Sequence, residues 1–187
     1  MKILNKKTLW EGRYLRTSLI TYLGRDGIQH TWEAYDRPGI SGIVVIVPVT
    51  DAGKLLLIRQ FRPAIGDYVI ELPAGLNDRD ESPADCARRE LEEETGYCAG
   101  MMERLISGPY SAAATRGKLD VFLATGLEFV GKSGGDDNED IEVVEISIDE
   151  AMDFLIAAER KGGLVDLKIF GLVELARRKY MSQFPSS

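Results

Sequence analysis

The sequence predicts an α/β fold, in which a mixed β-sheet is covered by helices on both faces and preceded by antiparallel strands. Three observations lead to this prediction. Strand signals dominate the N-terminal third, a continuous apolar run follows them, and amphipathic helical patterns begin only after residue 80. The 187 residues are enough for one domain with a sizeable core.

The N-terminal third begins with a predicted β-hairpin. Thr17–Leu23 and Ile28–Tyr35 are rich in β-branched and aromatic residues, and they flank the turn sequence GRDG. The next run, Gly42–Val49 (GIVVIVPV), is apolar throughout, which is typical of a strand buried on both faces. Leu55–Phe61 and Tyr68–Leu72 complete this group of strands, and the sequence PAG then breaks the pattern.

A well-delimited helix follows. Ser82 is a good N-cap, Pro83 suits the first turn, and Asp85 stands three residues after Ser82 as in a capping box. Gly96 is placed to end the helix in the left-handed conformation.

The C-terminal half alternates strands and helices. Strands are expected around Arg104–Ser107, Leu119–Leu127 and Ile141–Ile148. Asp149 is expected to cap a helix over Glu150–Arg160, and Leu167–Tyr180 forms a final amphipathic helix. Between them, Gly131–Asp140 (GKSGGDDNED) is predicted to be a polar, acidic loop.

Charge and composition exclude several classes of protein. The formal net charge is −7, which argues against a nucleic-acid or membrane-surface binder because those normally carry a basic face. No apolar run is long enough to span a bilayer, and the N-terminus lacks the apolar segment of a signal peptide. Cys86 and Cys98 form no metal-binding or disulfide pattern, so we expect reduced thiols in a cytoplasmic protein. The single histidine, His30, rules out HExxH zinc chemistry, and we expect it on a strand surface.

The predicted helix after Ser82 carries an unusual cluster of acidic residues, RELEEE. On a helical wheel, Glu90, Glu93 and Glu94 share an arc of roughly 100°, whereas Glu92 faces elsewhere and Leu91 points to the core. Three neighbouring carboxylates repel one another unless their charge is compensated. A hard divalent cation such as Mg²⁺ compensates it best, and a solvated charged face is the alternative.

The whole stretch Gly75–Tyr97, GLNDRDESPADCARRELEEETGY, resembles the signature of the Nudix hydrolases, with Tyr97 where the family usually has an aliphatic residue. The resemblance implies a Nudix-type α/β/α sandwich over a single domain, 1–187. Residues 1–40 would form N-terminal strands for dimerisation and base binding, and 41–187 the catalytic core. It also implies a Mg²⁺ or Mn²⁺ site held by Glu90, Glu94, Glu93 and the carbonyl of Ala74. Arg89 would orient these glutamates, and Glu81 would support the loop.

Two further segments, Tyr14–Pro38 and Arg59–Leu76, resemble ADP-ribose and ADP-sugar pyrophosphatases, which are Nudix hydrolases. The resemblance implies a homodimer in which Trp32, next to Glu33, stacks on the adenine across the dimer. Tyr14 would stack on the opposite face of the base. Stacking of a base on aromatic side chains is physically sound.

The same resemblance assigns phosphate binding to Arg62 and a catalytic carboxylate to Glu139. Arg59 lies three residues before Arg62, so strand alternation turns it to the other face. Glu139 lies in DDNEDIEV, where it would activate the attacking water or bind a further metal ion. The sequence departs from the family at Ala112, in YSAAATRGK, where a proline is usual. This departure puts the identity of the terminal sugar in question.

Three functions are therefore compared. The leading expectation is metal-dependent cleavage of an ADP-sugar, above all ADP-ribose, to AMP and ribose 5-phosphate. Hydrolysis of another nucleotide sugar, such as GDP-mannose or a UDP-sugar, is the second. The third is a sensor that binds ADP-ribose without cleaving it, and the complete set of glutamates argues against that role.

Overall fold

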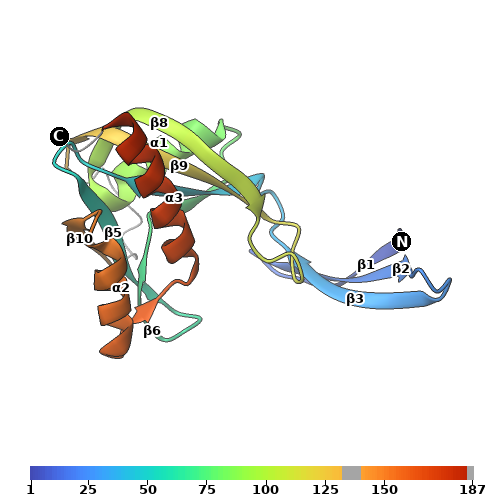
Figure 1. The fold of residues 1–187 in the computed structure, drawn as a ribbon. Coiled ribbons are helices and arrows are strands. Elements are labelled where there is room, and N and C mark those ends of the chain that lie inside the picture. Colours follow the sequence, from blue (N-terminus) through green and yellow to red (C-terminus); the bar gives the residue numbers. More distant parts are fainter. Residues whose placement is uncertain (132–139, 185–187) are drawn as a thin grey trace.

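The structure is a computed structural model, and it describes residues 1–131 and 140–184. Figure 1 shows a body of sheets and helices from which a small N-terminal sheet projects. The elements in chain order are β1 (Lys2–Glu11), β2 (Arg16–Leu23), β3 (Gln29–Asp36), β4 (Gly42–Pro48), β5 (Lys54–Arg62), β6 (Asp67–Glu71), β7 (Ala74–Asn77), α1 (Pro83–Thr95), β8 (Tyr97–Pro109), β9 (Lys118–Phe129), β10 (Ile141–Ser147), α2 (Ala151–Arg160), β11 (Leu164–Val165) and α3 (Lys168–Gln183).

The projecting sheet consists of β1, β2 and β3 in antiparallel order. The predicted hairpin is confirmed, with Ile20 opposite Trp32 in its register. β1 was not predicted, because all ten of its residues are exposed and no alternation of buried and exposed positions marks it as a strand. It is held by its backbone pairing with β2.

The body contains two four-stranded mixed sheets where the sequence predicted one. One has the order β7-β4-β9-β8 and the other β10-β5-β6-β11. In the first sheet β4 and β9 are parallel, and in the second β6 and β11 are parallel. All other neighbouring strands in the two sheets are antiparallel. The predicted α/β class is confirmed, and the division into two sheets arises from strand partners that lie far apart in the sequence.

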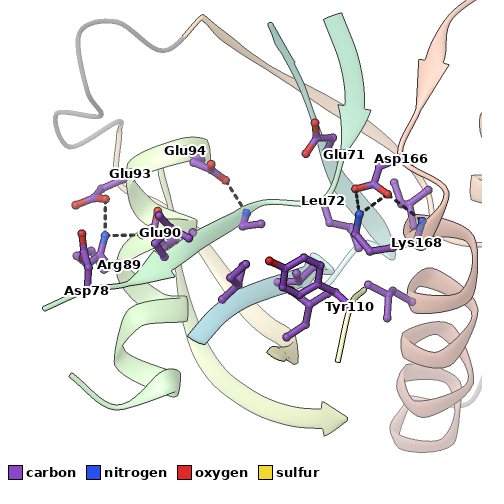
Figure 2. A pocket seen from close by; sticks show the side chains of 18 of the residues that line it. Glu71, Leu72, Asp78, Arg89, Glu90, Glu93, Glu94, Tyr110, Asp166 and Lys168 are labelled. Carbon is purple, nitrogen blue, oxygen red and sulfur yellow. Dashed lines mark hydrogen bonds and ion pairs between the residues drawn. The ribbon is translucent and has the colours of Figure 1, made fainter. Parts of the chain in front are cut away.

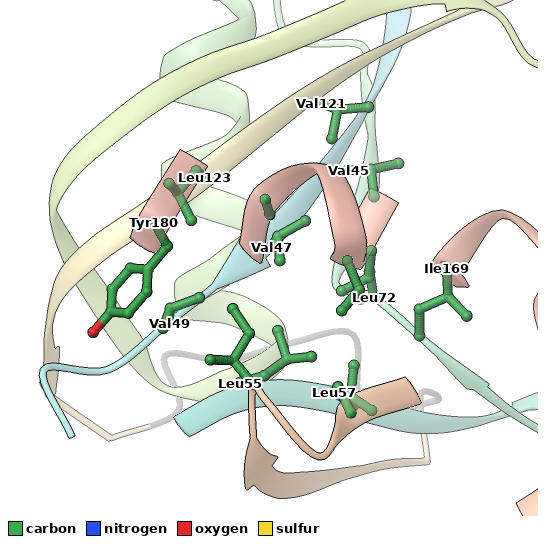
Figure 3. Close-up of a cluster of buried hydrophobic side chains, with 14 of the residues drawn as sticks. Val45, Val47, Val49, Leu55, Leu57, Leu72, Val121, Leu123, Ile169 and Tyr180 are labelled. Atoms are coloured by element: carbon green, nitrogen blue, oxygen red, sulfur yellow. The ribbon is translucent and has the colours of Figure 1, made fainter. Parts of the chain in front are cut away.

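β4 is buried on both faces, as its apolar run predicted, and it joins two layers of core. Val44 and Ile46 pack against α1, in one cluster with Leu91 of that helix. Val45 and Val47 face the opposite way, into a larger cluster to which β5, α2 and α3 contribute (Figure 3). The sheet β7-β4-β9-β8 therefore has α1 on one face and the second sheet with α2 and α3 on the other.

The predicted boundaries of α1 are confirmed. The Ser82 hydroxyl accepts a hydrogen bond from the Asp85 backbone N–H at 3.1 Å, and Gly96 ends the helix with φ 79°. The cap predicted at Asp149 for α2 is wrong. Glu150 occupies the cap position in helical conformation without a side-chain bond, and Asp149 instead pairs with Arg177 at 3.5 Å.

The sequence PAG does not break the sheet as predicted, because β7 begins within it. β7 pairs with β4, and the Ile46 N–H donates to the Pro73 carbonyl at 2.8 Å. This strand runs beside α1 and fixes the backbone of Ala74 and Gly75 against the acidic face of the helix. No helix among the described residues is long and apolar enough to span a membrane.

Candidate active site

A pocket of about 910 Å³ lies between α1 and the beginning of α3. Figure 2 shows Glu90, Glu93, Glu94 and Arg89 on one side, Asp166 and Lys168 on the other, and Tyr110 between them. The volume falls within the roughly 300–1,000 Å³ that is usual for small-molecule sites. The apolar part of the lining includes Ile43, Val45, Leu72, Leu119, Ile169 and Leu172.

The acidic face of α1 points into this pocket as the helical wheel predicted. Glu90, Glu93 and Glu94 line it, whereas Glu92 lies outside and accepts a hydrogen bond from the Cys98 thiol. Leu91 is fully buried in the core on the far side of the helix. The helical period of 3.6 residues is therefore what gathers three of the four glutamates on one wall.

Arg89 ties these carboxylates together. One of its terminal nitrogens donates to Glu90 and to Glu93, at 2.8 Å each, and the other donates to Glu81 at 2.7 Å. Burial alone would lower the pKa of Arg89, but the hydrogen bonds and charges of these carboxylates outweigh it and raise the pKa. The hydrogen bond from Arg89 lowers the pKa of Glu81. Glu81 thus pairs with Arg89 from outside the pocket.

β7 approaches α1 so closely that a side chain at its second residue, Gly75, would displace the carboxylate of Glu90. A Cβ atom on Gly75 would lie 1.8 Å from the carboxyl carbon of Glu90 and 2.1 Å and 2.3 Å from its oxygens. Next to it, the backbone N–H of Ala74 donates to the buried carboxylate of Glu94 at 3.0 Å. The backbone of β7 and the glutamates of α1 therefore form one unit.

The donors present fit a hard divalent cation in kind. Carboxylate and carbonyl oxygens are the ligands that Mg²⁺ prefers, and Glu90, Glu93, Glu94 and Ala74 all border the pocket. In the arrangement seen, Arg89 bridges two of the carboxylates, and within residues 1–131 and 140–184 no three acidic, histidine or cysteine side chains are gathered tightly enough to hold a metal ion. The glutamates would change side-chain rotamers to bind one.

Arg62, the residue expected to bind a phosphate, lines the same pocket at the end of β5. Its guanidinium forms two parallel hydrogen bonds with the carboxylate of Glu71, both of 2.7 Å. This two-point pairing fixes the plane of the guanidinium. Arg59 faces away from the pocket, as predicted, and lies over the Tyr68 ring at 4.1 Å.

The residues expected to hold the base lie outside this pocket. Tyr14, Trp32 and Glu33 belong to the projecting sheet and its first turn, and all three are exposed. The indole N–H of Trp32 donates to the carbonyl of Ala113 at 2.6 Å, so the loop after β8 contacts β3 of the same chain. A base that stacks on Trp32 would therefore need contacts with residues outside this pocket.

Two other expectations concern single residues. Glu139 lies outside the described residues. His30 is half-exposed on β3, where it pairs with Asp26 at 2.9 Å and stacks on Tyr22, so the expected strand-surface position is confirmed. Ala112, the departure from the family pattern, lies in the loop that contacts Trp32 and Tyr35.

Seven charged or aromatic residues of the pocket were not predicted as site residues: Arg37, Glu71, Asp78, Arg79, Tyr110, Asp166 and Lys168. None of them belongs to the acidic helix. Lys168 and Asp166 pair at 2.6 Å beside the first turn of α3. No local pattern marks these residues as site residues, because they come from segments that meet only in the folded chain.

Comparison with known proteins agrees with this architecture. The model of the NUDIX domain matches residues 41–167. ADP-ribose pyrophosphatase of Bacillus subtilis is 31% identical, over 85% of this chain and 88% of the relative. GDP-mannose pyrophosphatase of Escherichia coli is 33% identical, over 86% of this chain and 88% of the relative.

A solved structure described as an ADP compounds hydrolase shares the fold. It has a TM-score of 0.84 and 24% identity, and the match covers 100% of this chain and 98% of the other. The acidic helix, the strand that precedes it and these matches lead to one conclusion: the chain belongs to the Nudix hydrolase family.

Proposed function

We propose that this protein hydrolyses the diphosphate of an ADP-sugar in a metal-dependent reaction, and that ADP-ribose, cleaved to AMP and ribose 5-phosphate, is its leading substrate. The observation that carries the proposal is that three glutamates of α1 and Arg62 line one pocket. Support comes from the 31% identity to a relative named ADP-ribose pyrophosphatase over most of both chains.

Nudix hydrolases generally use divalent metal ions. We propose Mg²⁺ here, with Mn²⁺ as a substitute, held by Glu90, Glu93, Glu94 and the carbonyl of Ala74. When bound, the ion supplies neutralisation of the diphosphate and polarisation of the attacking water. A chain with a net charge of −7 would thus bind an anion through a cation.

The chain's own residues position the other parts of the reaction. Arg89 bridges Glu90 and Glu93 in the arrangement seen and is proposed to orient them for the ion. Arg62, which pairs with Glu71 at the pocket wall, is proposed to bind a phosphate. We propose Glu93 or Glu139 as the carboxylate that accepts a proton from the attacking water, which then breaks the P–O–P bridge and releases two phosphate monoesters.

A second nucleotide sugar is the alternative substrate. The relative named GDP-mannose pyrophosphatase is as similar in sequence as the ADP-ribose enzyme, and the loop around Ala112 departs from the ADP-ribose pattern. A sensor that binds ADP-ribose without cleaving it is the third candidate function.

The projecting sheet is proposed to form a homodimer. β1 exposes Ile3, Leu9 and Trp10, each at least half accessible, and Tyr14 and Trp32 lie outside the pocket. A second copy could cover these residues and complete a base site from both chains. We accordingly propose one domain, 1–187, with the strands of 1–40 serving the dimer and 41–187 forming the catalytic core. A monomer by light scattering at micromolar concentration would contradict this.

The cytoplasm is proposed as the compartment, because Cys86 and Cys98 are free thiols. We also propose that nucleic acid is not a partner, because the chain is acidic and carries no basic motif.

The decisive experiment is a hydrolysis assay with a matched pair of variants. Purified protein is incubated with ADP-ribose, ADP-glucose, GDP-mannose and UDP-glucose, with Mg²⁺, Mn²⁺ or EDTA, and the products are separated by chromatography. Glu94→Gln is compared with Glu92→Gln, which changes the same helix outside the pocket.

We expect AMP and ribose 5-phosphate from ADP-ribose with Mg²⁺ and none with EDTA. Glu94→Gln should lose about 10²-fold or more in kcat, an effect typical of removing one electrostatic stabiliser. Glu92→Gln should stay close to the wild type. Preferred cleavage of GDP-mannose would select the alternative substrate, and binding without products would support the sensor. Full activity of Glu94→Gln would refute the assigned metal site.

A further inference from the structure

A second pocket, of about 490 Å³, adjoins the first. It lies between the end of β3, the segment 37–43 and the loop that leads into β9. The two pockets share Arg37, Ile43 and Tyr110 as walls. The other lining residues are Arg16, Asp36, Pro38, Gly39, Ile40, Ser41, Gly42, Thr115, Arg116, Gly117 and Lys118.

The second pocket is basic, although the chain as a whole is acidic. Of its four cationic side chains, Arg16 is neutralised by Asp36 at 2.9 Å. Arg37, Arg116 and Lys118 form no ion pair within 4.0 Å in the described part of the chain. Asp36, the single carboxylate of the lining, is already shared between Arg16 and Lys6.

Arg37 has a donor that needs an acceptor. Its Nε atom is buried, and no hydrogen-bond partner for it exists among the described residues. A buried N–H without an acceptor costs roughly 1–3 kcal/mol, so an anionic ligand in contact with it would recover that cost. The guanidinium also borders the first pocket, which places it where a ligand could extend from one pocket into the other.

The two pockets therefore differ in how they can bind an anion. In the first pocket, six carboxylates outnumber five cationic side chains, and a bound cation is proposed to assist Arg62 in holding the diphosphate. The second offers uncompensated guanidinium and ammonium groups, which bind phosphate directly.

We propose that the second pocket is a metal-independent anion subsite, which takes a phosphate monoester that the nucleotide carries in addition to its diphosphate. The inference rests in part on the proposed function, because it places the diphosphate in the first pocket. The two arginines and the lysine then bind the additional phosphate across the shared wall at Tyr110. Nucleotides with a 2′- or 3′-phosphate on the nucleoside have the required chemistry.

The test separates this subsite from the catalytic site by removing metal. Binding of AMP, adenosine 2′,5′-bisphosphate and adenosine 3′,5′-bisphosphate is measured by calorimetry in EDTA, for the wild type and for the double variant Arg116→Gln/Lys118→Gln. The control is Arg160→Gln/Lys54→Gln, which removes the same charge from exposed positions outside both pockets. Inorganic phosphate is titrated as a competitor.

We expect at least one bisphosphate to bind the wild type about tenfold or more tightly than AMP. The double variant should lose this preference and the control should keep it, while both cleave ADP-ribose at near wild-type rates. Equal binding of AMP and both bisphosphates would overturn the proposal, as would a preference that survives in the double variant. Inorganic phosphate binding as tightly as a bisphosphate would also overturn it, since the ligand would then be free phosphate. A chain that shows the preference but cleaves no nucleotide sugar would refute the proposed function and retain the subsite.

Discussion

Replacing Gly75 by alanine tests the close approach of β7 to the acidic helix. Gly75 is not in the positive-φ region, so the backbone accepts alanine, and only the added methyl group matters. That group would lie 1.8 Å from the carboxyl carbon of Glu90. An ordinary van der Waals contact begins at 3.4 Å, so the carboxylate must move by about 1.6 Å.

A displacement of this size should affect activity more than stability. Misplacing a catalytic group by about 1 Å can cost ~10²-fold in rate, and we expect kcat/KM of Gly75→Ala to fall by about that factor. The flexible end of Glu90 can yield, so the free energy of unfolding should fall by no more than about 1–3 kcal/mol, the usual range for overpacking. Hydrolysis kinetics and urea denaturation measure the two effects.

Two comparisons make the result interpretable. Gly108→Ala adds the same methyl group where no atom lies within 4 Å and φ is not positive, so it should change neither quantity. In a Glu90→Ala background, Gly75→Ala should cause little further loss, because the displaced group is already absent. Wild-type activity of Gly75→Ala, or losses that add in the double variant, would show that the contact with Glu90 does not control the site.

Three further predictions concern binding, a thiol and the core. Arg62→Lys, which cannot reproduce the two-point pairing with Glu71, should lower kcat/KM for ADP-ribose by about tenfold, because an ammonium lacks the planar fork; unchanged kinetics would remove Arg62 from substrate binding. Burial raises the pKa of Cys86 to about 12. The thiol should therefore resist iodoacetamide at pH 8 until urea is added, and rapid alkylation of the folded protein, mapped by mass spectrometry, would contradict this. The pKa of the Cys86 thiol is higher in the folded protein than in the unfolded chain. The contribution of this thiol to the free energy of unfolding is therefore present below about pH 8.5 and is lost as pH rises toward 12. Leu57→Ala, in the larger core cluster, should lower the free energy of unfolding by about 2–5 kcal/mol. Leu167→Ala, at a side chain that is 83% exposed, should change it by no more than about 0.5 kcal/mol in the same urea titration.

The sequence alone determined what depends on neighbouring residues. Ser82 and Gly96 delimit α1 because capping involves atoms only a few residues apart. The period of the helix places Glu90, Glu93 and Glu94 on one side, and the apolar run of β4 marks a strand with two buried faces. These features predicted the fold class and the acidic wall of the pocket.

Only the tertiary structure decided what depends on strand pairing and on contacts between distant segments. β1 carries no burial pattern, and it is a strand because β2 offers it a backbone partner. Trp32 meets Ala113 across 81 residues, and Arg37 and Lys118, from distant segments, line the same second pocket. Such contacts form once the chain has closed large loops, and their energy comes from packing and pairing between segments that no local pattern links.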